Sequence, residues 1–299
     1  MVSERAQRLT WPLLGLPAMG WMLLFLLLPF YVLLCTAFGS IDPLFRNSVP
    51  AWNPLDWSFT QLFVVFDRLF GPNNFYLPPV LRTIVFVLIA VVISLLIAFP
   101  VAYFTARYAG RRKALVLTLL VAPFWISYMM RMLAWVNLLQ TDGLVNTILS
   151  LGGLLPIEVN WLSGKSYTVI MGLIYGYLPY MILPLFASLD RISPSLLEAA
   201  RDLGAGGFDV FKRVILPMSI PGIAAGILLV ALPMMGDYFT TDLLSGSPET
   251  SMIGNLINTS ISAPGQSGQA AALIIVVLVV LAAPMIWYTR STLTTEARS

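Results

Sequence analysis

Long apolar segments separated by short polar ones dominate the pattern of this chain of 299 residues. A helix needs about 20 apolar residues to cross the hydrocarbon core of a bilayer. Six segments are long enough, and each predicts one membrane-spanning helix. They are Leu13–Phe38, Val80–Tyr108, Ala114–Leu139, Tyr167–Leu189, Met218–Tyr238 and Ala270–Tyr288. The pattern therefore predicts an all-α integral membrane protein with six transmembrane helices.

The composition supports this prediction. Hydrophobic residues make up 58% of the chain and charged residues only 10%, whereas a soluble domain is about a quarter charged. The chain contains no histidine, which excludes a histidine metal site or proton relay within it. Its one cysteine, Cys35, lies in an apolar run and indicates packing rather than chemistry. The sequence pI near 9.1 does not indicate nucleic-acid binding, because basic residues mark the cytoplasmic side of membrane proteins.

The distribution of lysine and arginine predicts the orientation of the spans. With both termini in the cytoplasm, 12 of the 17 basic residues fall in cytoplasmic segments. They are Arg5, Arg8, Arg107, Arg111, Arg112, Lys113, Arg191, Arg201, Lys212, Arg213, Arg290 and Arg298. The strongest local cluster is Arg111-Arg112-Lys113, between the second and third spans. We therefore expect both termini to be cytoplasmic.

The regions between and around the spans suggest three parts. Residues 1–79 hold the first span and a long outer segment, in which Phe59–Phe70 predicts a helix lying at the membrane interface. Residues 80–289 form a core of five spans with a cytoplasmic loop at 190–217, and residues 290–299 form a cytoplasmic tail.

The loop at 190–217 is polar and predicts a helix, a turn and a second short helix. Ser193 or Ser195 can cap the first helix, and Ser195 with Glu198 has the spacing of a capping box. Gly204 is placed to end that helix in the left-handed conformation. One side of the helix is apolar and the other polar; the apolar side holds Leu196, Ala199, Ala200 and Leu203, and the polar side holds Glu198, Arg201 and Asp202. Without further information, such a loop is also typical of a connector lying on the bilayer.

The spacing within this loop resembles the EAA loop of ABC importer permeases. Glu198-Ala199-Ala200, then Gly204, Val214 and Leu216-Pro217 match the family pattern, with Val214 where isoleucine is usual. The resemblance implies that the loop is a coupling helix on which a cytoplasmic ATPase docks. The implied ATPase-coupling residues are Glu198, Ala199, Ala200, Arg201, Asp202, Gly204, Phe208 and Phe211.

Other segments resemble the spermidine/putrescine permeases within this type I importer family. They are Trp125-Ile126-Ser127-Tyr128 with Arg131, Gly143-Leu144-Val145-Asn146, the run from Gly236 to Leu244, and the run from Met252 to Ile257. The resemblance implies ATP-driven import of polyamines or a similar small amine by alternating access, in the bacterial cytoplasmic (inner) membrane. Permeases for other small solutes share parts of these segments and remain an alternative.

The resemblance also implies the partners of the chain. They are a cytoplasmic ATPase dimer that binds ATP and magnesium, a second permease subunit that is a different chain, an extracytoplasmic solute-binding protein and membrane lipid. Gly164-Lys165-Ser166 looks like the end of a phosphate-binding loop, but Val159 stands where such a loop needs glycine. We therefore expect a permease subunit that is not an enzyme and binds no cofactor itself.

Ionisable residues in or near spans are candidates for a translocation pathway. The candidates are Asp237, Tyr238 and Asp242 near the end of the fifth span, Arg131 in the third, and the aromatics Trp125, Tyr128, Trp135 and Tyr177, with Tyr175 and Tyr180 nearby. Carboxylates pair with ammonium groups and aromatic faces attract cations. Each also has a structural interpretation: the carboxylates as solvated loop residues, Arg131 in an ion pair or snorkelling to the interface, and the aromatics as packing or belt residues.

A runner-up from another class is a carrier driven by an ion gradient. Such a carrier needs a proton or ion relay within its spans, and Arg131 is the one clear mid-span charge. Because only an ABC permease needs a stable ATPase partner, co-purification separates the two hypotheses.

Overall fold

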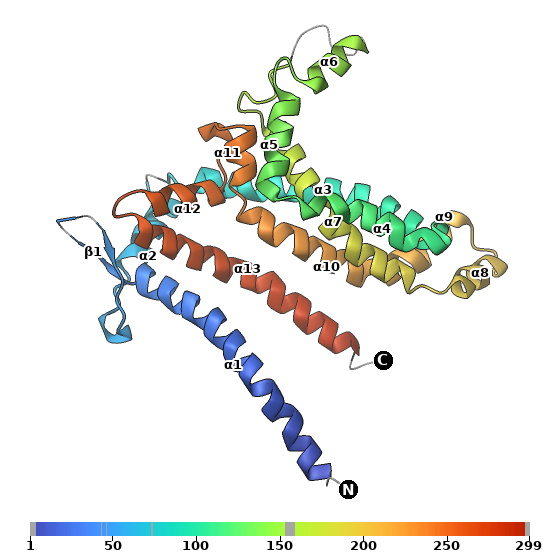
Figure 1. The fold of residues 1–299 in the computed structure, drawn as a ribbon, viewed down its shortest axis with the longest axis horizontal. Coiled ribbons are helices and arrows are strands. Elements are labelled where there is room, and N and C mark those ends of the chain that lie inside the picture. Colours follow the sequence, from blue (N-terminus) through green and yellow to red (C-terminus); the bar gives the residue numbers. More distant parts are fainter. Residues whose placement is uncertain (1–3, 43, 46, 73, 153–158, 297–299) are drawn as a thin grey trace. The chain divides into compact units, whose positions relative to one another are not determined.

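The computed structural model describes residues 4–42, 44–45, 47–72, 74–152 and 159–296, and these are mostly helical (Figure 1). The strands in this part of the chain are β1 (Ser40–Ile41) and β2 (Ser48–Val49), which pair antiparallel. The chain divides into two compact units. The first holds Met1–Phe75 and Ile257–Val279, and the second holds Tyr76–Leu256 and Val280–Ser299.

Within the described residues, five helical segments are long and apolar enough to cross a membrane. They are Gly15–Ala37 of α1 (Glu4–Ala37), α3 (Leu77–Tyr108), α7 (Ser166–Asp190), Gly207–Met235 and Ser267–Ile286 of α13 (Ser267–Glu296). Gly207–Met235 joins α9 (Gly207–Val210), the π-helical turn η4 (Phe211–Ile215) and α10 (Leu216–Met235). Five of the six predicted spans are therefore confirmed as single apolar helices.

The third predicted span, Ala114–Leu139, is not one straight helix. Its two parts, Gly110–Trp125 and Tyr128–Leu139, are bent by 86° relative to each other. The first part holds η2 (Gly110–Arg112), α4 (Lys113–Val121) and η3 (Ala122–Trp125), and the second is α5 (Tyr128–Leu139). The bend arises at Ile126 and Ser127, whose ψ angles of 137° and 139° are extended rather than helical. The segments on both sides of the bend are apolar, so the hydropathy pattern does not reveal the bend.

The core of the second unit lies where α3, α7 and α10 pack against one another. Small residues permit this close approach, as is common for helices in membranes. At Gly222 of α10, an added Cβ would lie 2.4 Å from Ser188 Cβ and 2.8 Å from Pro184 O of α7. Any side chain larger than hydrogen at this position would therefore force the two helices apart.

The other helices of the described residues are shorter. They are η1 (Pro54–Asp56), α2 (Thr60–Phe70), α6 (Leu144–Leu151), α8 (Pro194–Asp202), α11 (Phe239–Leu244), η5 (Pro248–Thr250) and α12 (Ile253–Ser262). The predicted helix at Phe59–Phe70 is confirmed as α2, which buries Val65 and Leu69 and exposes Phe63 and Phe66. Its position at the membrane interface stays a prediction.

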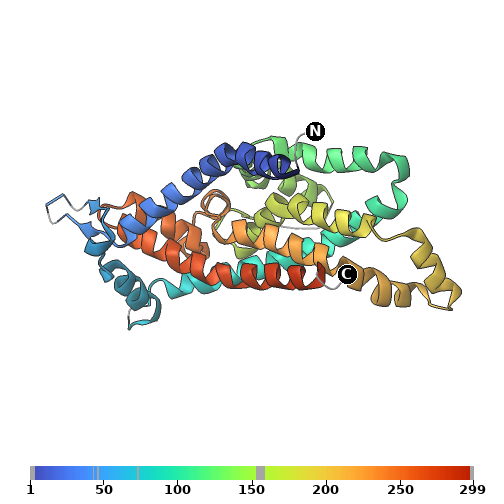
Figure 2. The same cartoon turned by 90° about the horizontal axis from the view of Figure 1, so that it is seen from below.

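Within the second unit, α8 and α9 lie beyond one end of the long helices, and α11 lies toward the other end (Figures 1 and 2). The two candidate functional regions, the loop around α8 and the residues preceding α11, therefore lie at opposite ends of α7 and α10.

Candidate functional site

A cavity of about 490 Å³ lies in the second unit, among η3, α5, α7 and the junction between α10 and α11. Aromatic side chains supply much of its wall: Phe124, Trp125, Tyr128, Tyr177, Tyr180 and Tyr238. The bend in the third predicted span creates one side of it, because η3 and the start of α5 both face the cavity. Asp237 and Arg131 are the charged residues that line it.

The Asp237 carboxylate is buried, with only 6% of the residue exposed. Its Oδ2 accepts hydrogen bonds from the hydroxyls of Tyr128 at 2.6 Å, Tyr177 at 3.2 Å and Thr240 at 2.7 Å. Its Oδ1 accepts the backbone N–H of Thr240 at 3.0 Å, at the start of α11. The structural interpretation of Asp237 as a solvated loop residue is therefore wrong. The carboxylate instead joins α5 and α7 to the junction between α10 and α11.

Arg131 is equally buried, with 6% exposed, and its guanidinium carbon lies 4.0 Å from the centre of the Phe124 ring. In the described part of the chain it forms no ion pair, and its Nε and Nη1 are buried without a hydrogen bond. The predicted ion pair is therefore not observed among the described residues, and snorkelling to the outer interface stays a prediction. The aromatic face compensates part of the cost of burying this charge.

Two of the predicted pathway residues, and the nearby Tyr175, do not line the cavity. Asp242 is exposed and accepts a hydrogen bond from Asn255 Nδ2 at 2.6 Å. Trp135 packs edge-on against Tyr175, with ring centres 5.3 Å apart. The structure thus gathers Trp125, Tyr128, Arg131, Tyr177, Tyr180, Asp237 and Tyr238 around one space and leaves Asp242, Trp135 and Tyr175 outside it.

Sequence reasoning missed Thr240 and Phe124. The spacing of Asp237 and Thr240 is a signal that could have found the first, because an aspartate just before a helix often accepts N–H groups of its first turn. Phe124 carries no comparable signal. It becomes important only because the bend brings its ring beside the guanidinium of Arg131.

The polar loop forms the predicted helix–turn–helix, and its first helix begins at one of the two predicted caps. Pro194 lies in the first turn of α8, and Ser193 is the N-cap residue without a side-chain capping bond. The predicted capping box of Ser195 and Glu198 is wrong. Pro194 has the fixed φ that suits the first helical position, so Ser195 lies inside the helix, where its hydroxyl donates to Ser193 Oγ at 3.2 Å.

The end of α8 agrees with the prediction. Gly204 has a φ of +84°, in the left-handed region. Ala205 N donates to Ala200 O at 3.1 Å, and Gly204 N donates to Arg201 O at 2.8 Å. This pair of bonds is a Schellman motif, which satisfies carbonyl groups that a helix end otherwise leaves free.

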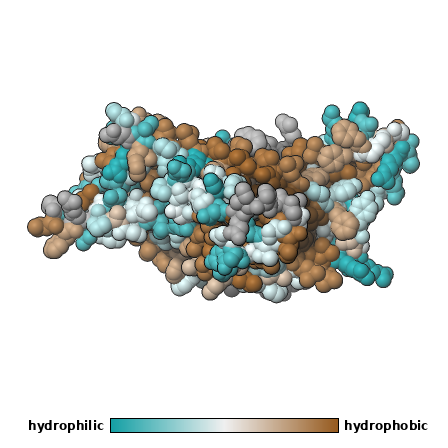
Figure 3. Space-filling model, turned by 90° about the horizontal axis from the view of Figure 1, so that it is seen from above, coloured by the Kyte–Doolittle hydropathy of each residue, from teal (hydrophilic) through white to brown (hydrophobic). Residues whose placement is uncertain are grey.

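The loop exposes apolar side chains at the end of the second unit. Leu203 is 89% exposed and Phe208 is 75% exposed, whereas Leu197 is buried against the core. Phe211 packs edge-on against Phe99 of α3, with ring centres 5.7 Å apart. Glu198, Ala199, Arg201 and Asp202 are exposed and Ala200 is half-buried. In Figure 3, brown hydrophobic and teal hydrophilic residues lie side by side toward the right-hand end, the end that carries α8 and α9 in Figure 1.

Comparison with known families decides what kind of protein carries this cavity and loop. Residues 98–292, well over half of the chain, match the family described as the binding-protein-dependent transport system inner membrane component. The chain belongs to this family. It is a permease subunit of an ABC importer and a multi-pass inner-membrane protein, and such subunits are not themselves enzymes. The matched region includes both the cavity and the loop.

Curated relatives of the permease cover most of its length. The spermidine/putrescine transport system permease protein PotB of Escherichia coli K12 is 35% identical over 241 residues, 80% of this chain and 82% of that protein. The protein of the same name from Haemophilus influenzae is 34% identical over 283 residues, 94% of this chain and 93% of that protein. The inner membrane ABC transporter permease protein YdcU of Escherichia coli K12 is 32% identical over 258 residues, which are 82% of this chain and 81% of that protein.

Solved structures agree on the fold of the permease. A chain of a bacterial alginate ABC transporter, crystallised with an alginate pentasaccharide-bound periplasmic protein, superposes with a TM-score of 0.66 at 20% identity and covers 95% and 93% of the two chains. A second structure of an alginate-importing ABC transporter gives 0.64 at 24% identity and 96% coverage of both. At these identities the likeness concerns the fold alone.

Proposed function

We propose that this permease imports polyamines or a similar small organic amine by alternating access. The single observation that carries the proposal is the buried carboxylate of Asp237 in a cavity walled by tyrosines and tryptophan. A carboxylate attracts an ammonium group, and aromatic faces attract cations when water is excluded. The names of two relatives, both spermidine/putrescine permeases, support the same class of solute.

Within the loop at 190–217, α8 and the turn that follows it form the proposed docking site for the ATPase. The exposed apolar side chains of this loop, Leu203 and Phe208 above all, suit a protein partner because such anchors gain most from burial in a pocket. We infer that Glu198, Ala199, Ala200, Arg201, Asp202, Gly204 and Phe208 contact the ATPase and that Phe211 holds the loop against α3. ATP and magnesium bind to the ATPase subunits, whose closure moves the loop and rocks the spans.

The remaining partners follow from the same mechanism. An extracytoplasmic solute-binding protein delivers the amine, and a second permease of different sequence completes the cavity. The resemblance to the polyamine permeases favours a different chain over a second copy. Family membership decides against the alternative of a carrier driven by an ion gradient.

The proposed topology places both termini in the cytoplasm, with Ser166 outside and Ser195 inside. In a variant whose Cys35 is replaced by alanine, Ser166→Cys should react with a membrane-impermeant maleimide added to intact spheroplasts. Ser195→Cys should react only after permeabilisation, and so should Ser299→Cys, although Ser299 lies outside the described residues. Both Ser166 and Ser195 are exposed in the structure, so a lack of labelling in cells that express the permease without its ATPase reports sidedness rather than burial. Reaction of Ser195→Cys in intact spheroplasts would contradict this topology and indicate the opposite orientation.

Uptake by the reconstituted importer tests the solute class. The permease, its partner permease, the ATPase and the binding protein should move labelled spermidine or putrescine into proteoliposomes when ATP is supplied on the ATPase side. Neutral solutes of similar size, such as small sugars, should not compete. Uptake of a neutral solute together with no uptake of either amine would contradict the proposal.

The guanidinium of Arg131 favours a second candidate solute. It faces the same cavity without an anionic partner in the described residues. A small amine that also carries a carboxylate, such as 4-aminobutyrate, could pair with both charges. Competition of 4-aminobutyrate with spermidine in the same proteoliposomes separates the two candidate solutes. A site for amines that also carry a carboxylate should prefer 4-aminobutyrate, whereas a polyamine site should prefer spermidine.

A further inference from the structure

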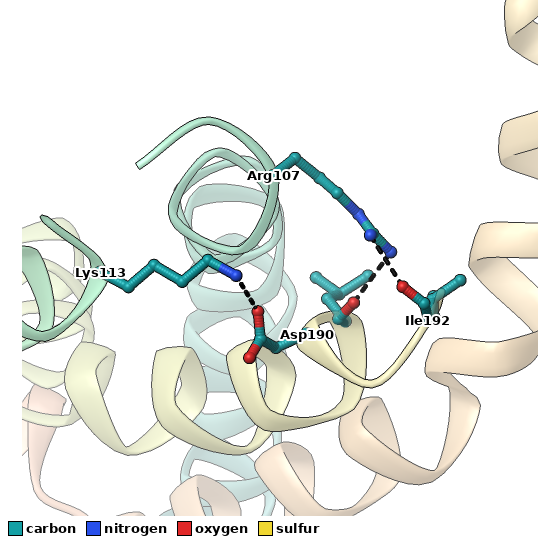
Figure 4. Close-up of polar contacts among 5 residues, drawn as sticks. Arg107, Lys113, Asp190 and Ile192 are labelled. Carbon is teal, nitrogen blue, oxygen red and sulfur yellow. Dashed lines mark hydrogen bonds and ion pairs between the residues drawn. The ribbon is translucent and has the colours of Figure 1, made fainter. Parts of the chain in front are cut away.

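Three helix ends meet directly before the docking helix α8 (Figure 4). Arg107, in the last turn of α3, donates from Nη1 to Ile192 O at 2.8 Å and from Nη2 to Leu189 O at 3.0 Å. Lys113, the first residue of α4, forms an ion pair with Asp190, the last residue of α7. Side chains from α3 and α4 thus hold the end of α7 from two sides.

The contact of Arg107 is suited to fixing a direction. The last carbonyl groups of a helix have no partner within the helix, and the planar guanidinium presents its N–H groups in a rigid fork. By binding Leu189 O in the last turn of α7 and Ile192 O just beyond the helix, Arg107 orients the peptide groups that lead into Ser193, the N-cap of α8. The docking helix therefore starts from a backbone that α3 holds in place.

Stability alone does not explain the second contact. The side chains of Lys113 and Asp190 are 34% and 37% exposed, and exposed ion pairs contribute little to folding. The pair instead connects distant parts of the sequence, since its members are 77 positions apart. It joins the end of α7, three residues before the docking helix, to the start of α4.

The other end of α4 leads to the cavity. α4 has nine residues and continues directly into η3, whose Phe124 and Trp125 line the cavity wall. A helix of that length spans about 14 Å. A push or pull on Asp190 would therefore reach the aromatic wall through α4 and η3.

We propose that Lys113, Asp190 and Arg107 form a mechanical link through which movement of the docking helix reaches α4 and the cavity wall. They are positioning residues that touch neither solute nor nucleotide. This inference rests on the proposed docking role of α8 but goes beyond it, because it names the route by which docking changes the cavity.

Charge exchange tests the link in the complete reconstituted importer. Lys113→Asp and Asp190→Lys each place like charges together, and the double variant Lys113→Asp with Asp190→Lys restores an opposite pair. We expect each single variant to lower spermidine uptake per ATP hydrolysed by roughly two- to 30-fold, the usual range for residues that modulate coupling. Basal ATP hydrolysis and ATPase association should persist, and the double variant should recover most of the coupling.

A solute-independent readout separates this inference from the proposed function. Ile126→Cys, in a Cys35→Ala background, reports access to the cavity, because Ile126 lines it and is 56% exposed. ATP should change the labelling rate of this cysteine in the otherwise unaltered complex and in the double variant, but much less in the single variants. If spermidine is not imported at all, the proposed function fails while the labelling still tests the link.

Two further variants sharpen the test. Arg112→Asp is the matched control, because Arg112 is exposed next to Lys113 and has no ion pair among the described residues. It should couple normally. Arg107→Lys keeps the charge and loses the fork, so it should couple less well while still assembling. Uncoupling by Arg112→Asp as strong as that by Lys113→Asp, or a double variant no better than the single ones, would overturn the link.

Discussion

Replacing Gly204 with valine should weaken binding of the ATPase by roughly five- to 30-fold while the spans remain inserted. Gly204 closes α8 with a φ of +84°, where a side chain costs about 1–2 kcal/mol and a β-branched one more. An added Cβ would meet nothing within 4 Å, so the cost is one of backbone conformation rather than collision. If the ATPase binds only the closed turn, this free energy appears in full in the association constant.

A graded series identifies the backbone as the cause. Gly204→Asn should be the mildest replacement, because asparagine tolerates the left-handed region, with Gly204→Ala between it and valine. Gly207→Val adds the same side chain three residues later, at a glycine without a positive φ and with open space around it. Affinity measured by titrating the purified ATPase onto the permease complex should follow this order. An equal loss in Gly207→Val would show that bulk in the loop, and not the turn, weakens binding.

The spans and the loop were largely predictable because their signals are local. Runs of apolar residues place five spans, and one glycine at the right spacing places the end of α8. The sequence predicted the start of α8 only as one of two caps, Ser193 or Ser195, because two local signals compete. The capping-box spacing favours Ser195 as the cap, whereas Pro194 is pre-organised for the first helical position and moves the cap to Ser193.

The cavity was only partly predictable, because its contacts are long-range. Tyr128 and Asp237 are 109 residues apart and meet only because the third predicted span bends at Ser127. Two aspartates five residues apart also have opposite environments, Asp237 buried and Asp242 exposed. The turn from α10 into the short helix α11 separates the two aspartates, and no pattern of charge or hydropathy predicts that turn.

Replacing Asp237 with asparagine has the second large expected effect. The variant keeps the shape of the side chain, and its Oδ1 can still accept the backbone N–H of Thr240. The hydroxyls of Tyr128 and Thr240 can rotate to accept from the new amide, because a hydroxyl is both donor and acceptor. Folding, membrane insertion and ATPase binding should therefore persist, and what is lost is the negative charge in the cavity.

The loss of that charge should lower amine uptake by roughly five- to 150-fold. A hydrogen bond to a charged group contributes about 1–3 kcal/mol, which converts to that range if the contact with the ammonium forms in the limiting step. The measurement is the ratio of maximal uptake to half-saturating concentration for spermidine in proteoliposomes with equal amounts of permease. Asp142→Asn, which removes an exposed carboxylate that does not line the cavity, is the matched control and should transport normally.

Tyr128→Phe distinguishes a cation site from a structural tie. The carboxylate of Asp237 receives four hydrogen bonds and connects α5 and α7 to the start of α11, so it could serve the fold alone. In that case Tyr128→Phe and Asp237→Asn should lower thermal stability by similar amounts, and each should impair uptake only in proportion to its loss of stability. If Asp237 binds the cation, Tyr128→Phe should retain most uptake because the negative charge remains, whereas Asp237→Asn loses uptake at unchanged stability. Spermidine uptake by Asp237→Asn at the rate of the unaltered permease would assign the carboxylate to the fold and leave the cavity without its proposed cation site.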